Sequence, residues 1–366
     1  MQRRLTDSVS SRYCWCAVAS AVAVDVGDQL TAHVSGIARC GSPWACPMCA
    51  PVVRQQRADE IGAGMLRHLE DGGSAVFVTF TVRHHQADEL AGRLGVVSEV
   101  LHHVLAGSPW KRRRDRLGYV GSIKATEITY GDRNGWHPHA HALLLFDRVL
   151  TSDERNDLHV WMAGRWAGVV DRLGLGTVNG HGFDLRAVES VADLGSYLAK
   201  VDGGWSVGLE LARSDRKSAA PLELLGHLVE TGESRWAALW HEYERATFGK
   251  RAIVWSPGLR ERLLGVEEEI SDPKAAALEG SDLTLLRALI SHAYWNARVR
   301  AGAQGETLTE IEQVSGLLLW LSVSAGHVVQ PLDVPTGVHD AGGAEGPPES
   351  GALAGTPDRC HTLGVP

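Results

Sequence analysis

The ten residues His137–Phe146, HPHAHALLLF, constrain the fold more than any other stretch of the chain. Side chains alternate between the two faces of a strand, so His137, His139 and His141 leave on one face. Imidazoles on alternate strand residues can converge on one metal ion. The alternative is a half-buried strand whose histidines only bond to their neighbours. Three histidines in register beside an apolar run favour the metal site.

A second strand precedes this one and predicts a hairpin. Residues 119–130, YVGSIKATEITY, have the composition of a strand, and the turn residues 131–135, GDRNG, follow directly. In such a hairpin Glu127 can sit across from the histidines. A carboxylate with two imidazoles is a sound set of ligands for Mg²⁺ or Mn²⁺ and leaves positions open for phosphate oxygens. The alternative for Glu127 is an exposed strand carboxylate.

Five of the six cysteines lie close together near the start of the sequence. Cys46 and Cys49 form a C-x2-C knuckle, Cys40 lies six residues upstream, and either Cys14 or Cys16 can complete a tetrahedral site. In a reducing cytoplasm, clustered thiolates favour zinc over disulfides. We therefore predict structural zinc, with Cys14 as the fourth ligand. A redox CxxC is the alternative, although such a motif normally lacks a third nearby cysteine.

The remaining elements follow from periodicity and turn residues. Helices are predicted over 52–69, 86–105, 153–173, 283–290 and 308–321, with two more within 221–247; short strands are predicted over 75–82, 183–187 and 251–255. From position 331 onward Gly and Pro dominate, which indicates disorder. The expected divisions are a zinc-binding segment (1–70), a catalytic domain (71–265), a helical appendage (266–330) and a tail (331–366).

The net charge of −8 is unevenly distributed. Residues 266–366 contain 14 acidic and 5 basic side chains, so the rest of the chain is close to neutral. That part carries one dense basic run, expected to be a loop that is solvated or contacts DNA phosphates. The run consists of Lys111, Arg112, Arg113, Arg114 and Arg116. No apolar window is long enough for a membrane span and no signal peptide is recognisable, so a cytoplasmic location is expected.

A predicted helix over 187–201, AVESVADLGSYLAKV, carries a second set of candidate residues. Asp193, Tyr197 and Lys200 share one face of it. Tyrosine is a poor nucleophile at its ordinary pKa of about 10, but a metal that polarises a phosphate makes its attack feasible. Lys200 could supply a cation and Asp193 could accept a proton or activate water. The alternative is an ordinary amphipathic helix with surface charges.

Four motifs in this order resemble the HUH endonucleases, and specifically the single-tyrosine rolling-circle replication initiators (Rep proteins) on plasmids of high-GC Gram-positive bacteria. They are CGSPWACPMC, FVTFTV, GWHPHAHALLLF and DLGSYLAKV, and LWHEYERATFGKRAIVWSPGLR resembles a later block of the family. The resemblance covers roughly residues 14–262. It implies an α+β fold: a central antiparallel sheet flanked by helices, with the metal strand in its middle and the tyrosine helix packed across it.

The resemblance also implies site roles and partners. His139 and His141 match the metal pair, His137 a supporting or substrate contact, Tyr197 the nucleophile, and Asp193 a carboxylate that promotes the final hydrolysis. Relatives often have Glu at that last position, which is one methylene longer. The implied activity is sequence-specific nicking and joining of single-stranded origin DNA through a 5′-phosphotyrosine. Host helicase and polymerase are the implied partners.

Three other functions remain open from the sequence. A conjugative relaxase or an HUH transposase would share the histidine pair, but relaxases usually place the tyrosine before it and the transposases are much shorter. A DNA-binding regulator containing zinc would lack catalysis, against which Tyr197 and Glu127 argue. A zinc hydrolase using all three histidines would need a general base, and no HExxH-like arrangement is present.

Overall fold

The computed structural model describes residues 14–18, 21–27, 32–175, 182–188, 220–265 and 284–313. Within it the chain forms two compact units. The larger unit contains residues 41–276 and the smaller unit residues 11–40 with those from 277 onward. No helix in the described ranges is both long and apolar enough to cross a bilayer.

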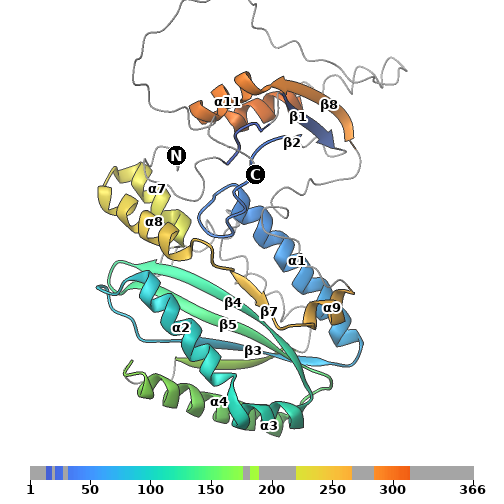
Figure 1. The fold of residues 1–366 in the computed structure, drawn as a ribbon, viewed down its shortest axis with the longest axis vertical. Coiled ribbons are helices and arrows are strands. Elements are labelled where there is room, and N and C mark those ends of the chain that lie inside the picture. Colours follow the sequence, from blue (N-terminus) through green and yellow to red (C-terminus); the bar gives the residue numbers. More distant parts are fainter. Residues whose placement is uncertain are drawn as a thin grey trace, which may run out of the picture. The chain divides into compact units, whose positions relative to one another are not determined.

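The larger unit is built on an antiparallel sheet of five strands with β5 at its centre (Figure 1). The strand order is β6-β3-β5-β4-β7. The strands are β3 (Ser74–Thr81), β4 (Tyr119–Gly131), β5 (Gly135–Phe146), β6 (Phe183–Val188) and β7 (Ile253–Trp255). This confirms the predicted α+β class and the central place of the histidine strand.

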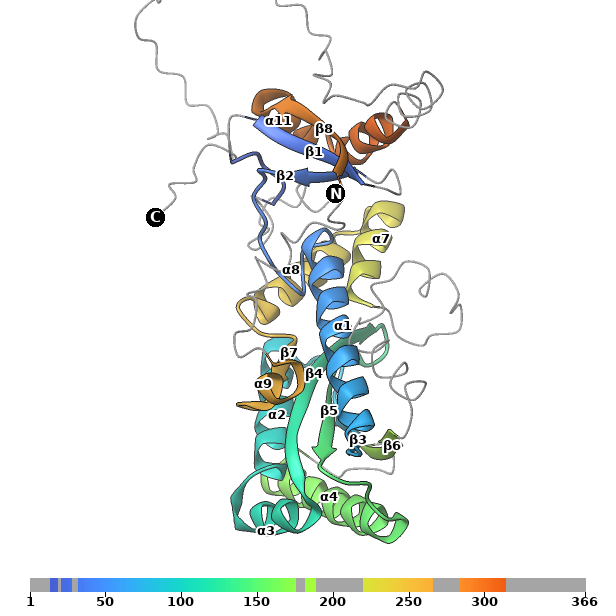
Figure 2. The same ribbon diagram turned by 90° about the vertical axis from the view of Figure 1, so that its right-hand side faces the viewer.

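Helices cover both faces of this sheet, which explains the unbroken apolar run at the end of β5. Leu143 and Leu145 join a core that includes Ile61 and Met65 of α1 (Cys49–Glu70). Leu144 and Phe146, on the opposite face, join the core formed with α2 (Leu90–Val104) and α4 (Ser152–Arg172). Figure 2 shows α1 on one side of the sheet and α2 on the other. A strand buried on both faces needs apolar side chains at every position.

The basic run lies in a helix rather than in the loop that its charge suggested. Helix α3 (Gly107–Leu117) contains all five cations, and Gly118 ends it with a left-handed φ of 72°. Trp110 and Leu117 are buried and anchor one side of the helix. The expectation of a loop was wrong because two apolar residues spaced seven apart, followed by a C-terminal glycine, are enough to dock a short helix.

Three further helices complete the described part of the larger unit. They are α7 (Pro221–Thr231), α8 (Ser234–Thr247) and α9 (Leu259–Leu264). Helices α7 and α8 correspond to the two predicted within 221–247. Their buried residues, including Leu224, Trp236 and Trp240, belong to the same core as Leu143.

The smaller unit has its own sheet of three strands in the order β2-β1-β8. These are β1 (Ala21–Gly27), β2 (Ala32–Ser35) and β8 (Thr284–Ser291), and α11 (His292–Ala301) follows β8. The helix predicted over 283–290 was wrong. A short apolar run such as this one is compatible with a helix or a strand. It forms a strand here because it pairs with β1 in an antiparallel ladder. The predicted disordered tail, 331–366, lies outside the described residues.

Gly135, at the start of β5, allows the loop after β3 to pack against the β4–β5 turn. Its φ is 73°, and a Cβ atom there would lie 2.9 Å from Cα of Gln86 and 3.1 Å from the His85 carbonyl oxygen. The Gln86 side-chain amide also donates a hydrogen bond to the Asp132 carbonyl at 3.0 Å. Only glycine meets both the backbone and the space requirement at this position.

We therefore expect Gly135→Ala to destabilise the protein more than Gly232→Ala. Gly232 has a similar φ of 69° but open space around it, so alanine there costs only the left-handed conformation, about 1 kcal/mol. At position 135 the overlap with backbone adds roughly 1–3 kcal/mol. Urea unfolding of the two variants measures the difference. Equal losses would show that the loop does not press on Gly135.

Candidate functional site

Four imidazole rings lie in a row along one face of the sheet. The ring centroids of His141 and His139 are 5.9 Å apart, those of His139 and His137 are 3.8 Å apart, and those of His137 and His84 are 3.9 Å apart. Phe77 stacks on the His141 ring at 5.3 Å. The period-two prediction for the three strand histidines is thus confirmed in its geometry. The row continues onto a residue from another segment, His84.

Both neighbouring strands contribute groups that bond to the histidine pair. In the register of the sheet, Thr79 of β3 lies opposite His141 and Glu127 of β4 lies opposite His139. The Nδ1 atom of His141 is 3.1 Å from the Thr79 hydroxyl, and its Nε2 atom is 2.9 Å from a Glu127 carboxylate oxygen. His139 repeats the first contact, with Nδ1 3.3 Å from the hydroxyl of Thr81. Each imidazole is therefore oriented through its Nδ1 atom by a threonine.

The nitrogen and oxygen atoms at these contacts are of the kinds that bind divalent metal ions. An imidazole whose Nδ1–H donates to a hydroxyl presents the lone pair of Nε2 to a ligand. His139, His141 and Glu127 then offer two nitrogens and one carboxylate, a set that suits Mn²⁺ or Mg²⁺ with open positions. In this structure Glu127 bonds directly to His141. The ligand atoms of these three residues are not gathered closely enough to count as a metal-binding group in the described part of the chain. The metal role of the histidine pair stays a prediction.

His137 is enclosed between His84 and His139. Its Nε2 atom is buried and has no hydrogen-bond partner among the described residues. Burial, reinforced by the neighbouring imidazoles, lowers the pKa of His137 to about 3. Burial also lowers the pKa of His84. Both rings are therefore neutral near pH 7 and can act as hydrogen-bonding or ligand groups without adding positive charge.

The sequence analysis did not identify Thr79, Thr81 or His84 as site residues. The two threonines occupy alternate positions in FVTFTV, and His84 follows that strand. The sequence did contain a signal for the threonines. Thr79 and Thr81 are two residues apart, so both side chains leave β3 on one face, and they can face the histidines of β5 if the two strands pair in the right register. Using it requires knowing that β3 pairs with β5 and in which register, which the sequence of either strand alone does not give.

Asp193, Tyr197 and Lys200 lie outside the described residues. Their assigned roles in nucleophilic attack, proton transfer and charge stabilisation therefore stay predictions.

The cysteines predicted to bind zinc are paired within each unit. In the larger unit the sulfur atoms of Cys46 and Cys49 lie within 4.8 Å of each other, and in the smaller unit so do those of Cys14 and Cys40. Cys14, and not Cys16, is among these thiols. Four thiolates have the number and chemistry of a structural zinc site. Zinc itself stays a prediction.

The basic run on α3 is partly neutralised within the protein. The guanidinium groups of Arg113 and Arg116 both bond to the carboxylate of Asp157, with Arg116 at 3.0 Å. These bonds, chiefly the one from Arg113, lower the pKa of Asp157. Lys111 and Arg112 are exposed. The predicted DNA-contacting role for the run therefore applies better to its exposed members than to all five.

We expect Thr79→Val to weaken Mn²⁺ binding about 10–100-fold, because the isosteric valine removes the group that orients His141. Thr79→Ser keeps a hydroxyl and should retain most of the affinity. Thr126→Val is a matched control, since Thr126 pairs with Ala140 and faces the other side of the sheet. Isothermal titration with Mn²⁺ compares the four proteins. Equal affinity for the Thr79→Val variant and wild type would rule out this positioning role.

We expect the purified wild-type protein to contain about one equivalent of zinc, and Cys46→Ser to lose it because three thiolates hold zinc less tightly than four. Cys16→Ser should keep its zinc. Metal analysis after gel filtration measures both. Loss of zinc in Cys16→Ser with retention in Cys14→Ser would reverse the assignment of the fourth ligand.

Comparison with known proteins gives the family. The family described as "Replication protein" matches residues 33–158. "Protein rep" of Streptomyces lividans is 35% identical over 325 residues, which covers 70% of this chain and 69% of that protein. The "Neomycin resistance protein" of Streptomyces cyanogenus is 34% identical over 134 residues, 30% of this chain and 31% of that protein. No solved structure matches significantly. The chain belongs to the Rep family of plasmid replication proteins.

Proposed function

We propose that this Rep protein initiates rolling-circle replication as an HUH endonuclease. It nicks single-stranded DNA at one sequence of the plasmid origin and later joins the ends, with Tyr197 as the nucleophile. The observation that carries this proposal is the arrangement around β5. His139 and His141 lie on the central strand, with Glu127 2.9 Å from His141 and a threonine against each imidazole.

The proposed reaction is a transesterification at one phosphodiester. The Tyr197 oxygen forms a bond to phosphorus, the bond from phosphorus to the 3′ oxygen breaks, and the protein becomes joined to the 5′ phosphate. The phenol proton leaves to a base or to water, and the departing 3′ oxygen gains a proton to give a 3′-OH that a polymerase can extend. Lys200 would offset charge at the phosphate. Asp193 would activate water when the final intermediate is hydrolysed.

A divalent ion, Mg²⁺ or Mn²⁺, would supply Lewis-acid polarisation of the scissile phosphate when bound. His139, His141 and Glu127 would hold it, and the threonine contacts would keep both rings in the binding orientation. His137, neutral and adjacent to the pair, would contact DNA or support the ligands. Cys14, Cys40, Cys46 and Cys49 would together hold structural zinc.

The origin DNA and host replication proteins, a helicase and a polymerase, are the proposed partners. A regulator that binds DNA without cutting it is the alternative from a different class. It would account for the zinc cluster and the basic helix but leaves the histidine pair and Glu127 without a role. A relaxase would use the same metal ligands, and the order of histidines before tyrosine favours the initiator.

Suicide cleavage tests the proposal. Single-stranded oligonucleotides tiling the replicon that encodes this protein are labelled at the 3′ end and incubated with wild-type protein and Mn²⁺. We expect one oligonucleotide to give a labelled protein band that survives SDS, because the 5′ phosphate of the labelled fragment stays on Tyr197. The same oligonucleotide labelled at its 5′ end should give a shorter, unbound fragment that polymerase extends.

Variants separate the chemistry from folding. Tyr197→Phe and His141→Ala should give no adduct while retaining zinc, whereas Tyr294→Phe, which removes a hydroxyl from α11, should behave as wild type. An adduct that persists in Tyr197→Phe would refute the nucleophile. Specific DNA binding by the wild type with no adduct at any tile would favour the regulator.

A further inference from the structure

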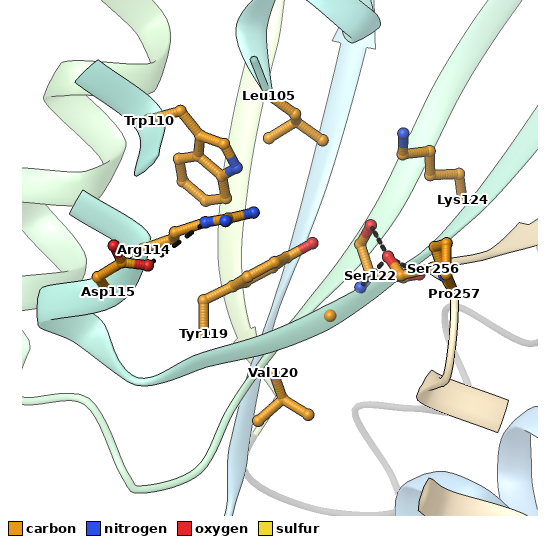
Figure 3. A pocket seen from close by; sticks show the side chains of 11 residues that line it. Leu105, Trp110, Arg114, Asp115, Tyr119, Val120, Ser122, Lys124, Ser256 and Pro257 are labelled. Carbon is orange, nitrogen blue, oxygen red and sulfur yellow. Dashed lines mark hydrogen bonds and ion pairs between the residues drawn. The ribbon is translucent and has the colours of Figure 1, made fainter. Parts of the chain in front are cut away.

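A pocket of about 440 Å³ opens beside the first half of β4 (Figure 3). It lies between the end of α2, helix α3, strand β4 and the residues that follow β7. The side chains that matter to the argument are Trp110, Arg114, Tyr119, Ser122, Lys124 and Ser256. None of them belongs to the histidine site.

The pocket lies on the opposite face of the sheet from the histidines. Directly paired residues on neighbouring antiparallel strands share a face. Glu127 pairs with His139, whereas Lys124 pairs with Ala142 and Ser122 with Leu144. Ala142 and Leu144 belong to the core on the α2 and α4 side. A ligand in this pocket would therefore contact the protein separately from one at the metal ligands.

Lys124 is the central charge of the pocket. Its side chain is half-buried, and burial lowers its pKa. Among the described residues no carboxylate lies within ion-pair distance of it, whereas Arg114 has Asp115 at 3.5 Å. Figure 3 shows the ammonium group directed to the pocket side of β4. A half-buried ammonium without an anion is costly, and an anion from outside the protein would offset that cost.

An aromatic wall stands across from this charge. Trp110 is buried and packs edge-on against Tyr119, with ring centroids 5.2 Å apart and planes at 73°. Tyr119 is partly exposed, and Figure 3 shows its hydroxyl directed toward Ser122, which lies further along the same strand. The Ser122 and Ser256 hydroxyls are 3.1 Å apart and lie on the Lys124 side of the pocket (Figure 3). The buried indole thus packs against a second ring, Tyr119, that is partly exposed.

We propose that this pocket binds one nucleotide unit of single-stranded DNA, with the phosphate on Lys124 and the base against Tyr119. A cation beside an accessible aromatic ring is the combination by which proteins hold unpaired nucleotides. Arg114 and the exposed Lys111 and Arg112 of α3 extend the positive charge beyond the pocket, where neighbouring phosphates of a strand would lie. This second DNA contact goes beyond the nicking site and does not depend on cleavage.

Fluorescence anisotropy tests it with labelled single strands of about 16 nucleotides. The proteins carry Tyr197→Phe and the buffer contains no added Mg²⁺ or Mn²⁺, so cleavage does not affect the result and the structural zinc is left in place. Lys124→Met should weaken binding severalfold and reduce the dependence of log K on log salt by about 0.7, the loss of one phosphate contact. Lys250→Met, at an exposed lysine outside the pocket, should bind as the parent does.

The aromatic contact has its own pair of variants. Tyr119→Phe keeps the ring and should bind as the parent, whereas Tyr119→Leu should lose about fivefold to a hundredfold in affinity. A duplex of the same sequence should not show this difference, because its bases are not available for stacking. Thermal melts confirm folding, and Lys124→Met still tests the pocket if the leucine variant is unstable.

A free deoxynucleoside monophosphate, added as competitor, distinguishes a strand from a small-molecule ligand. The proposal is supported if the monophosphate competes only weakly with the oligonucleotide and oligonucleotide binding depends on Lys124. Two results would overturn it: unchanged single-strand binding in both Lys124→Met and Tyr119→Leu, or Lys124-dependent binding of the monophosphate without any effect of Lys124 on the oligonucleotide. If these binding tests fail but the wild-type protein still forms the covalent Tyr197 adduct with origin DNA, the pocket proposal is refuted and the proposed nicking function stands.

Discussion

The register of β5 between β3 and β4 is the constraint on which the candidate site depends. Because side chains alternate in a strand, a slip of one residue would move every histidine to the opposite face and put Ala140 or Ala142 opposite Thr79. The observed register places Thr79 opposite His141 and Glu127 opposite His139. Two different strands thus act on one imidazole from its two nitrogens. Neither contact could be moved without moving the whole strand pair.

The apolar half of β5 fixes that register. Residues 142–146 are buried on both faces, and their neighbours on β3 and β4 are also largely buried. Burial of these side chains would be lost if the strand shifted, at roughly 1.5–3 kcal/mol for each large residue exposed. The preceding half, residues 137–141, has no large aliphatic side chain, although Pro138, Ala140 and His141 are buried. The site is therefore held in place by the leucines that follow it, which explains why histidines and leucines share one strand.

Much of the five-stranded sheet could be predicted from the sequence, because the evidence was local. Periodicity located β3, β4 and β5, and the glycine-rich turn 131–135 set the hairpin that brings Glu127 to the histidines. What was missed required long-range pairing. Thr79 and His84 become site residues only through the β3–β5 pairing, and 284–291 becomes a strand only through β1. The density of basic residues led to the wrong prediction of a loop at α3, where burial of Trp110 and Leu117 determines that the segment is a helix.

The topology also bears on how a tyrosine could reach the histidines. Strand β6 ends at Val188, which pairs with Ala75, whereas His141 lies beside Thr79 further along β3. The distance from Ala75 to Thr79 along a strand is about 13 Å at roughly 3.3 Å per residue. A helix that turned back from Val188 would advance about 13 Å by Tyr197, at roughly 1.5 Å per residue. If the helix predicted over 187–201 forms, the chain length between β6 and the proposed nucleophile fits the offset between the end of β6 and the histidine pair. A helix shorter or longer by two turns would place the phenol about 11 Å from that level, too far for attack on a phosphate bound there.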